Sequence, residues 1–588
     1  MSFWSATDKI PVLQKSVRLP SINGTSYNAG QEIRLHIPDN IKFFNPQATF
    51  IEADVTITPP TYVDTDGSGA IKPARLQLDA QTGFSSLIRA VRIHDRNGVL
   101  LEEYDHYNTW VALKYDYHTN PSLKGKRALT EGSTTYNINS RGTEGTAKSD
   151  QNDYLTNPYF LPATTGTQSA SFTSAKFVKA KCVVPLHTGI MSNSKLFMNG
   201  MIGGITITLL MEENRYPFRQ IESNMLWRKV KLNAKFLGVT AVGGSLPDSS
   251  TTKNTIYLEE VNSQVRDASK CNFVVGQKFG IFQATGASAG SKIAFTGGVA
   301  PEISAITYDS ASHNIYLTTK NNIAVNGSGA LPSRGDYYLY DRSVLDATSY
   351  NPTYHVENVN IVIQEVSAPA QFEAEMMRRM KEGGTINYDF TTQSTYLYSQ
   401  LATDRVANIR LPIENERCKA ILCVPTDATP YDAQQILNAS TTYKIELEGN
   451  AYPNYYLRSN RPNLEGIVDF ATTYQWFYDG RLQPARQVNL DRVASKEAIS
   501  AVQLLELDKA LASSGITGHS LSKFRDNFVI GRALGLNDMT YDARNKDFSL
   551  QINYQSVTSA PTKAKLWKCF VTSIRRLEVS SNGIRVIV

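Results

Sequence analysis

The strongest constraint on the fold of this chain is an internal repeat. The run IRLHI at residues 33–37 returns as IRLPI at residues 409–413. The first run alternates apolar and polar residues, which is the periodicity of a β-strand with one buried face. The elements after each run follow the same order: a second strand, a hairpin, a helix, a polar loop and further strands. Because the same order of elements occurs twice, the sequence predicts two similar folding units in one chain.

The hairpin and the helix are the best-defined members of the repeat. In the first copy, Asn97-Gly98 separates strand-like runs at residues 88–94 and 99–104. Asn-Gly tolerates the positive φ angles of a tight turn, so this stretch predicts a β-hairpin. Apolar residues at helical spacing follow at 110–117. The second copy repeats the series with a strand at 420–424, a run at 474–478 before Asp479-Gly480, a helical stripe at 504–511 and strands at 528–534 and 548–554.

The fold class follows from how such units bury their apolar faces. The chain has 588 residues, more than one compact core usually serves, and its 30 Tyr favour strands. Units whose strands each have one apolar face are stable as sandwiches, and eight strands with Greek-key returns form a jelly roll. We therefore predict an all-β protein of two tandem eight-stranded jelly rolls with short helices. The expected boundaries are an arm at 1–26, a first roll at 27–366 with a polar loop at 119–175 and a β-rich insertion at 240–350, and a second roll at 367–588 that opens with a linker helix at 370–382.

The linker helix lies at the seam between the two copies. Phe372, Met376 and Met380 recur every four residues, charged residues occupy the other face, and Gly383-Gly384 ends the run. We expect this apolar stripe to pack on the helix's own chain and to hold the two rolls at a fixed angle. The arm at 1–26 shows little periodicity, so we expect it to order only against a partner.

Composition argues against several classes of protein. A net charge of +6 is small for this size and gives little support to a nucleic-acid partner. Cys418 and Cys423 lie five residues apart in one predicted strand, so we expect them to face opposite sides of a sheet. With neither an apolar N-terminal segment nor a run of about 18 apolar residues, we expect no signal peptide and no transmembrane segment. The cysteines show no CxxC spacing and are expected to be buried free thiols: Cys182, Cys271, Cys418, Cys423 and Cys569.

No catalytic constellation stands out in the sequence. The 8 His are scattered, and no GxSxG, P-loop or dinucleotide motif occurs. The densest polar cluster surrounds the first hairpin and comprises His94, Asp95, Glu102, Glu103, Asp105 and His106. We interpret it as the solvated end of a hairpin rather than a cation site, because strand alternation sends successive side chains to opposite faces. The prediction is a protein that is not an enzyme, with no catalytic, cofactor-binding or metal-binding residues and no cofactor.

Two stretches give the chain a resemblance to a known family. One is CVVPLHTGIMSNSKLFMNGMIGGITITLLMEE at residues 182–213, with a Pro-Leu, small-residue, Gly-Gly and strand pattern. The other is VENVNIVIQEVSAPAQFEAEMMRRMKEGGTINYDF at residues 356–390, with a strand, a helix, Gly-Gly and Tyr388-Asp389. Over residues 27–588 the chain resembles the double jelly-roll major capsid proteins of virophages and Maverick/Polinton-like DNA viruses. It resembles those of giant DNA viruses and adenovirus more distantly.

The resemblance implies a structural protein of the virion. Members of this family form homotrimers in which six jelly rolls make a pseudo-hexameric block, and the blocks tile an icosahedral capsid. The implied partners are neighbouring capsomers, a penton protein and minor capsid proteins, with no sequence-specific nucleic acid. The implied place of synthesis is the cytoplasm or viral factory of the host cell. We also expect the loops at 119–175 and 240–350 to project together from the outward end of the block.

Two other functions use the same fold class and stay open at this stage. A two-module β-sandwich could bind carbohydrate as a lectin does, although the Trp residues are spread from Trp4 to Trp567 rather than clustered. A jelly-roll glycoside hydrolase would need two carboxylates opposed across a groove, and no pair is singled out. A monomer in solution would favour either alternative, and a stable trimer would favour the capsid protein.

Overall fold

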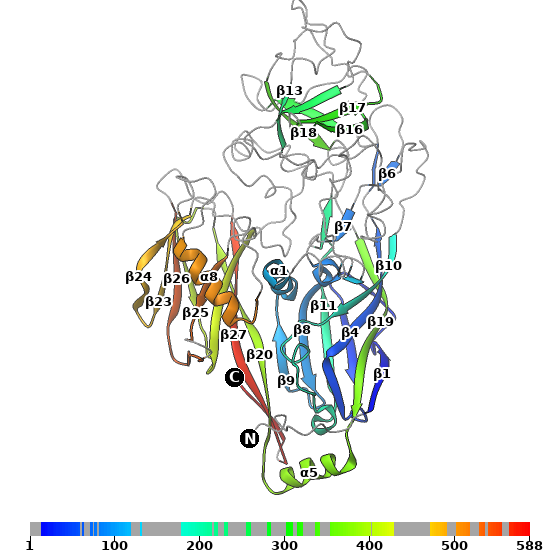
Figure 1. The fold of residues 1–588 in the computed structure, drawn as a ribbon, viewed down its shortest axis with the longest axis vertical. Helices are drawn as coiled ribbons and strands as arrows, with labels where there is room; N and C mark the ends of the chain where they lie inside the picture. Colours follow the sequence, from blue (N-terminus) through cyan, green and yellow to red (C-terminus); the bar gives the residue numbers. More distant parts are fainter. Residues whose placement is uncertain are drawn as a thin grey trace, which may run out of the picture.

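Two β-sandwiches stand side by side in the computed structural model of the chain, and a smaller sheet lies beyond one end of the first (Figure 1). Residues 1–12 lie outside the described part of the chain, as does most of the predicted loop at 119–175. The structure describes residues 13–58, 82–118, 178–214, 353–401, 403–427, 471–490, 501–517, 529–535, 539–554, 564–581 and 583–588, with shorter segments of 59–81, 119–177 and 215–352.

The first sandwich consists of two antiparallel sheets. Its strands are β1 (Leu13–Pro20), β2 (Ser26–Asn28), β3 (Glu32–Ile37), β4 (Phe43–Thr58), β8 (Ile88–Asp95), β9 (Leu100–Tyr104), β10 (Val178–Pro185), β11 (Ile205–Met211) and β19 (Thr353–Ser367). One sheet has the order β1-β19-β4-β10, with β2 paired to β19, and the other has the order β3-β11-β8-β9. The helix α1 (Tyr107–His118) follows the β8–β9 hairpin, as predicted.

The second sandwich is built in the same way. Its strands are β20 (Ile386–Gln400), β21 (Val406–Leu411), β22 (Cys418–Asp427), β23 (Ala471–Tyr478), β24 (Arg481–Asn489), β25 (Ile530–Ala533), β26 (Phe548–Tyr554), β27 (Lys565–Ser580) and β28 (Gly583–Ile587). The sheets have the orders β20-β27-β22-β25, with β28 paired to β27, and β21-β26-β23-β24. The helix α8 (Ala501–Ser513) precedes β25.

The strand orders establish the predicted duplication. When β2 and β28 are set aside and the other strands of each sandwich are numbered one to eight along the chain, both sandwiches have sheets of order 1-8-3-6 and 2-7-4-5. This order is that of a jelly roll. The two IRL runs lie in β3 and β21, the second strand of each roll, and both rolls place a helix between strands five and six. The prediction of an all-β double jelly roll is therefore confirmed.

Alternating side chains explain why these segments are strands. Residues of β11 alternate between buried and half-buried along its whole length, and β26 does the same. The buried set of β11 includes Ile205, Ile207 and Leu209, each fully or almost fully excluded from solvent. Just before β11, Gly204 has φ +94°, and a Cβ there would lie 2.7 Å from the carbonyl oxygen of Ile37. Only glycine fits such a close approach of two backbones.

The N-terminal boundary predicted from sequence is wrong for residues 13–20. These residues form β1, which pairs with β19 along its full length, from Leu13 opposite Ser367 to Pro20 opposite Asn360. They belong to the first roll rather than to an arm. The sequence signal is weak because β1 is an edge strand with mostly exposed side chains; only Val17 and Leu19 pack against the core.

The insertion is β-rich, as predicted, but it starts earlier than residue 240. Its six-stranded sheet has the order β15-β18-β13-β14-β17-β16. The strands are β13 (Arg228–Leu232), β14 (Thr255–Glu259), β15 (Phe279–Gln283), β16 (Ile303–Asp309), β17 (Asn314–Thr319) and β18 (Gly335–Asp341). Because β13 sits in the middle of this sheet, residues 228–232 belong to the insertion. In Figure 1 the sheet lies beyond the end of the first roll near α1.

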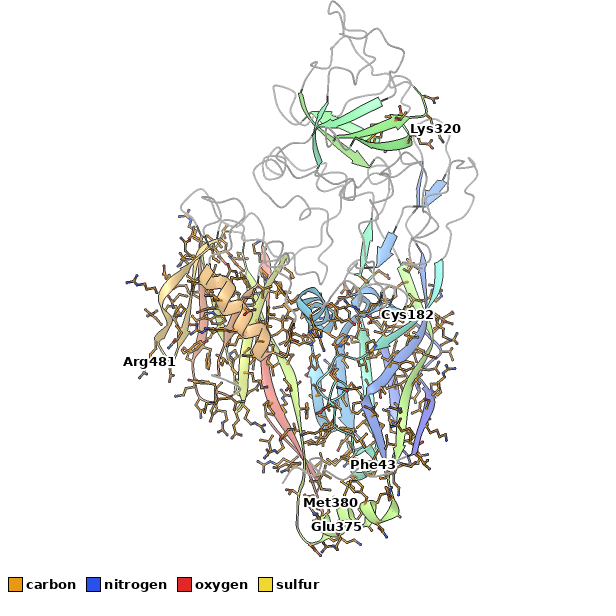
Figure 2. The ribbon with its side chains drawn as sticks, in the orientation of Figure 1. Phe43, Cys182, Lys320, Glu375, Met380 and Arg481 are labelled. Atoms are coloured by element: carbon orange, nitrogen blue, oxygen red, sulfur yellow. The ribbon has the colours of Figure 1, made fainter. Side chains whose placement is uncertain are left out.

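The linker helix α5 (Ala370–Lys381) is present and docks on its own chain. Met376 is completely buried, Phe372 and Met380 are half-buried, and all three pack against the core of the first roll. The ring of Phe372 lies 6.0 Å from that of Phe43. Figure 2 shows Phe43 facing α5, whose Glu375 lies on the outer side. The predicted packing of the apolar stripe is confirmed.

The cysteine predictions are confirmed for burial and wrong for orientation. Cys182, Cys418, Cys423 and Cys569 are buried free thiols, while Cys271 lies outside the described residues. Cys418 and Cys423 both face the core of the second roll. The register of β22 on β27 shifts between Cys418 and Ala420. Because the irregularity inserts one extra residue, the side chains of Cys418 and Cys423 point to the same face of the sheet.

Candidate functional site: the contact between the two rolls

The polar cluster predicted around the first hairpin does not converge on one point. Asp95 accepts a hydrogen bond from the backbone N–H of Val99 in the turn, at 2.7 Å. Glu103 forms an ion pair with Arg92 on the solvent side, at 2.7 Å. Glu102 is fully buried on the opposite face of the strand. The cluster is thus split by strand alternation: Asp95 is buried in the turn, and Glu102 is buried at the contact between the rolls.

The described residues contain neither a metal-ion cluster nor a membrane-spanning helix. No group of three or more His, Cys, Asp and Glu within this part of the chain could hold a metal ion. Among the same residues, no helix is long and apolar enough to cross a membrane.

The two rolls share one continuous apolar core. The larger of the two buried clusters contains the interior of the first roll together with Tyr388, Leu422 and Phe570 of the second. The sheet β20-β27-β22-β25 is therefore buried on both faces, since Cys423, Cys569 and other inward residues belong to the separate cluster inside the second roll. A sheet covered on both faces fixes its neighbours in position, because separation would expose large apolar areas to water.

At one end of this contact, β20 and β27 of the second roll pack against the start of α1. The ring of Trp110 packs 5.8 Å from that of Phe570 in β27. Lys568 donates a hydrogen bond from Nζ to Oγ1 of Thr109, at 3.1 Å. Thr395 of β20 donates its hydroxyl to the backbone carbonyl of Asp105, at 2.9 Å. One aromatic pair, one buried hydrogen bond and one partly buried hydrogen bond thus attach the second roll to the start of α1.

At the other end of the contact, β20 packs against the segment between β10 and β11. The rings of Phe197 and Tyr388 meet edge to face, with centroids 5.3 Å apart. Asn193 donates from Nδ2 to the backbone carbonyl of Asp389, at 2.9 Å. The carboxylate of Asp389 is held in turn by Arg576, at 2.9 Å from Nε. The Tyr388-Asp389 pair singled out in the sequence therefore lies at the roll–roll contact.

Glu102 lies where β20 of the second roll comes close to the segment after β10 in the first roll. Its two carboxylate oxygens accept the backbone N–H groups of Gly189 and Ile190, at 2.7 and 2.9 Å. Burial raises the pKa of Glu102, and the hydrogen bonds from the backbone of Ile190 and Gly189 oppose that shift. A Cβ on Gly189 would lie 2.2 Å from the carbonyl oxygen of Thr391 in β20. The contact therefore tolerates no side chain at position 189.

A second buried polar group surrounds Lys568. Asn108 donates from Nδ2 to Glu212 at 2.7 Å, and Glu212 is almost fully buried. Burial lowers the pKa of Lys568 to about 8, while the charges of Glu212 and Asp105 raise it and that of Arg89 lowers it. A charged lysine between two rolls costs folding free energy that an apolar side chain would not.

Replacing Lys568 by methionine should therefore change how stability depends on pH. In the folded protein, burial lowers the pKa of Lys568 to about 8 from its ordinary value of 10.5. The unfolded chain then binds more protons between these two pH values, so this residue makes the wild type more stable as pH rises from about 8 to 10.5. Lys568→Met should remove that contribution. We expect the difference in melting temperature, variant minus wild type, to fall steadily across this range in calorimetry, and a constant difference would contradict the assignment.

A third buried network lies under the helix α1 and involves no second-roll residue. Tyr115 donates its hydroxyl to Glu131 at 2.8 Å and lies 2.6 Å from Nε2 of His187. Burial raises the pKa of Glu131 to about 7. Arg127 stacks over the ring of Tyr115, with its guanidinium carbon 3.6 Å from the centroid. These contacts attach Arg127 and Glu131 to the first roll beside α1.

Sequence reasoning missed most of the residues at the contact. Trp110 is part of the predicted helical stripe, but nothing in the sequence pairs it with Phe570. Lys568 gave a weak signal, because it is a charged residue inside the apolar run WKCFV. A lone charge in such a run usually indicates a solvent-facing position, so the burial of Lys568 could not be predicted from it.

Comparisons with known proteins extend over nearly the whole chain at low identity. The chain matches the structure described as PBCV-1 VP54 fitted into a reconstruction of the virophage Sputnik, with 8% identity, a TM-score of 0.45 and 100% coverage of both chains. It matches the Faustovirus major capsid protein with 9% identity and a TM-score of 0.46, covering 98% of this chain and 92% of that one. It matches the mavirus major capsid protein with 11% identity and a TM-score of 0.40, covering 99% of this chain and 92% of that one. No family model and no curated protein matches.

Proposed function

We propose that this protein is a structural major capsid protein that forms trimeric, pseudo-hexameric capsomers tiling an icosahedral virion shell. The observation that carries the proposal is the fusion of two jelly rolls of identical strand order through one shared core. A chain built in this way supplies two near-equivalent blocks at a fixed angle. Three such chains give six blocks, which is the number a hexagonal tile requires. The role is structural rather than catalytic.

The physical basis of such a shell is the repetition of modest contacts. Closed symmetric assemblies use the same surface patches on every copy. Each lateral contact can be weak, because a tile held on several sides at once is bound far more tightly than by one contact alone. A rigid tile lowers the cost of assembly, since fewer degrees of freedom are lost on binding. The buried contact between the rolls supplies that rigidity here.

The proposal extends to partners and location. Neighbouring capsomers, a penton protein and minor capsid proteins would contact the tile, and the N-terminal residues before β1 are the proposed link to one of them. The mature protein would reside in the virion after synthesis in the host cytoplasm or viral factory. The connections that carry residues 119–175 and the insertion both leave the same end of the first roll, since alternate jelly-roll connections share an end. We assign that end to the outer surface of the shell.

The oligomeric state tests the proposal directly. Purified chain should run as a stable trimer of 65.2 kDa subunits in light scattering coupled to size-exclusion chromatography. Electron microscopy of the same fractions should show hexagonal blocks. A monomer at micromolar concentration in native buffer would refute the trimeric capsomer. A monomer that also bound glycans would favour the two-module lectin, and one that cleaved them would favour the glycoside hydrolase.

A further inference from the structure

Two of the buried cysteines face each other in the second roll. The strand β22 pairs with β27 in antiparallel register, and Cys423 lies directly opposite Cys569. Both side chains are completely buried and belong to the apolar cluster inside the second roll. Their thiols are hydrogen-bonded to each other. The two sulfur atoms are therefore neighbours within one sheet.

The backbone hydrogen bonds show which kind of cross-strand pair this is. The N–H of Ile574 in β27 donates to the carbonyl of Arg417, immediately before β22. Backbone N–H groups alternate in direction along a strand, so every second residue counted back from Ile574 points its N–H toward β22. Cys569 falls between those residues, and its backbone groups point toward β20 instead. The irregularity at the start of β22 lies in that strand and leaves the alternation along β27 intact. Cys423 and Cys569 thus form a non-hydrogen-bonded pair.

A pair of this kind has the spacing that a disulfide bond needs. Opposed residues of a non-hydrogen-bonded antiparallel pair have Cα atoms about 4.5 Å apart, closer than in the hydrogen-bonded kind. Disulfides join Cα atoms roughly 4.4–6.8 Å apart, so the bond can form without displacement of either strand. Among the four described cysteines, no other lies opposite a cysteine. Cys418 lies opposite Ser573. Cys182 is in the first roll, opposite Ala53.

We propose that Cys423 and Cys569 are a redox pair, which hydrogen peroxide oxidises to a disulfide bond between β22 and β27. The thiolate of one cysteine attacks a peroxide oxygen and becomes a sulfenic acid, while the O–O bond breaks and one water leaves. The second thiol attacks the sulfenic sulfur, the S–S bond forms, and another water leaves. The two thiols lose two electrons and two protons in total, and the peroxide is reduced to two waters.

Burial determines how fast this reaction runs and which reagents reach the pair. Hydrogen peroxide is close to water in size, whereas glutathione and alkylating reagents are much larger than the spaces of a packed core. Burial raises the pKa of the Cys423 thiol, and the hydrogen bond to Cys569 raises it further. Because the thiolate is the nucleophile, the pair should oxidise slowly. It should therefore stay reduced in a thiol-rich compartment and form the bond during long exposure to peroxide.

The bond would join two central strands of one sheet. The strand β27 lies between β20 and β22, and β22 in turn pairs with β25. A bond from the third strand of the second roll to its eighth encloses most of that roll in one covalent loop. Such a loop stabilises the fold chiefly by restricting the unfolded chain. The inference goes beyond the proposed function, because it concerns the chemistry within one roll and does not depend on assembly.

Oxidation of the full-length chain tests the pair directly. Protein with Cys271→Ser, purified under reducing conditions, is incubated with hydrogen peroxide, unfolded in iodoacetamide and digested for mass spectrometry. We expect a peptide in which Cys423 and Cys569 are joined by a disulfide bond, with Cys182 and Cys418 alkylated as free thiols. The melting temperature should rise by about 5 °C on oxidation and return to its first value when the bond is reduced.

Cys418→Ala is the matched control for Cys423→Ala. Both positions are completely buried in β22 and face the same core, but Cys418 lies opposite a serine. Cys418→Ala should keep the disulfide bond and the gain in melting temperature, and Cys423→Ala should lose both. Circular dichroism shows whether each variant folds. If Cys423→Ala does not fold, the peptide mapped in the parent protein decides alone.

The outcomes separate this inference from the proposed function. A disulfide bond between other cysteines, a sulfinic acid at Cys423, or free thiols at both Cys423 and Cys569 after long exposure would overturn the redox pair. A Cys423→Ala protein with the same gain in melting temperature would also overturn it. None of these results bears on the capsomer, whose test is the oligomeric state of the reduced chain. A monomeric chain would refute the trimer and leave the disulfide bond standing.

Discussion

Replacing Met376 by aspartate should lower the free energy of unfolding by on the order of 4 kcal/mol. Met376 is completely excluded from solvent between α5 and the first roll. The substitution removes a large apolar side chain from a packed site and leaves a carboxylate there without a partner. It should also loosen the connection between the rolls, because α5 is the segment that joins β19 to β20. Chemical denaturation of the purified protein measures the change.

The next residue along the helix is the control for this prediction. Met377 is 50% exposed on the outer side of α5, so Met377→Asp should change the free energy of unfolding by no more than about 0.5 kcal/mol. The two variants have the same change in composition, charge and helix propensity. Equal effects at both positions would show that α5 is disturbed as a helix rather than as a packed contact. No effect at Met376 would contradict the docking of α5.

Gly189→Ala should weaken the contact between the two rolls. The added Cβ would meet the carbonyl oxygen of Thr391 at 2.2 Å and Oε1 of Glu102 at 2.6 Å. One of these atoms is backbone and the other belongs to a carboxylate that accepts two hydrogen bonds, so neither can move without cost. We expect a loss of roughly 3 kcal/mol, at the upper end of what overpacking causes. Hydrogen exchange should rise in the 186–198 segment and in β20 before it rises elsewhere.

Thr391→Ala tests whether that effect comes from the close approach itself. The side chain of Thr391 is exposed, and only its backbone carbonyl faces Gly189. Removing the side chain leaves the carbonyl in place, so stability and hydrogen exchange should stay near the wild-type values. A Gly189→Ala protein with wild-type exchange in β20 would mean that the rolls are not packed as closely as these distances require.

Much of the fold could be predicted from local patterns. The hairpin at Asn97-Gly98, the helices α1, α5 and α8 and most strands have a periodicity that reflects one buried face. The repeat of the IRL runs assigned β3 and β21 to equivalent places, and the structure confirms this. Patterns of this kind are readable because each element is buried on one side only. Their order along the chain then limits the possible topologies.

The errors arose where burial did not follow the local pattern. The edge strand β1 has mostly exposed side chains, so its pairing with β19 left almost no signal. The irregular register of β22 between Cys418 and Ala420 reversed the predicted direction of Cys418. The insertion boundary at 240 missed β13 because strand membership in a sheet depends on distant partners. In each case the deciding interaction is non-local.

The sequence by itself determined that this protein is a duplicated all-β chain with a linker helix, because alternation, turn residues and helical spacing act over a few residues. Only the tertiary structure decided which faces meet. Trp110 and Phe570 are separated by most of the chain, and their contact depends on the angle at which α5 and the shared core hold the rolls. The same holds for Glu102, a hairpin carboxylate in the sequence and the centre of a buried contact in the fold. Its role follows from desolvation by a second roll, which no local pattern encodes.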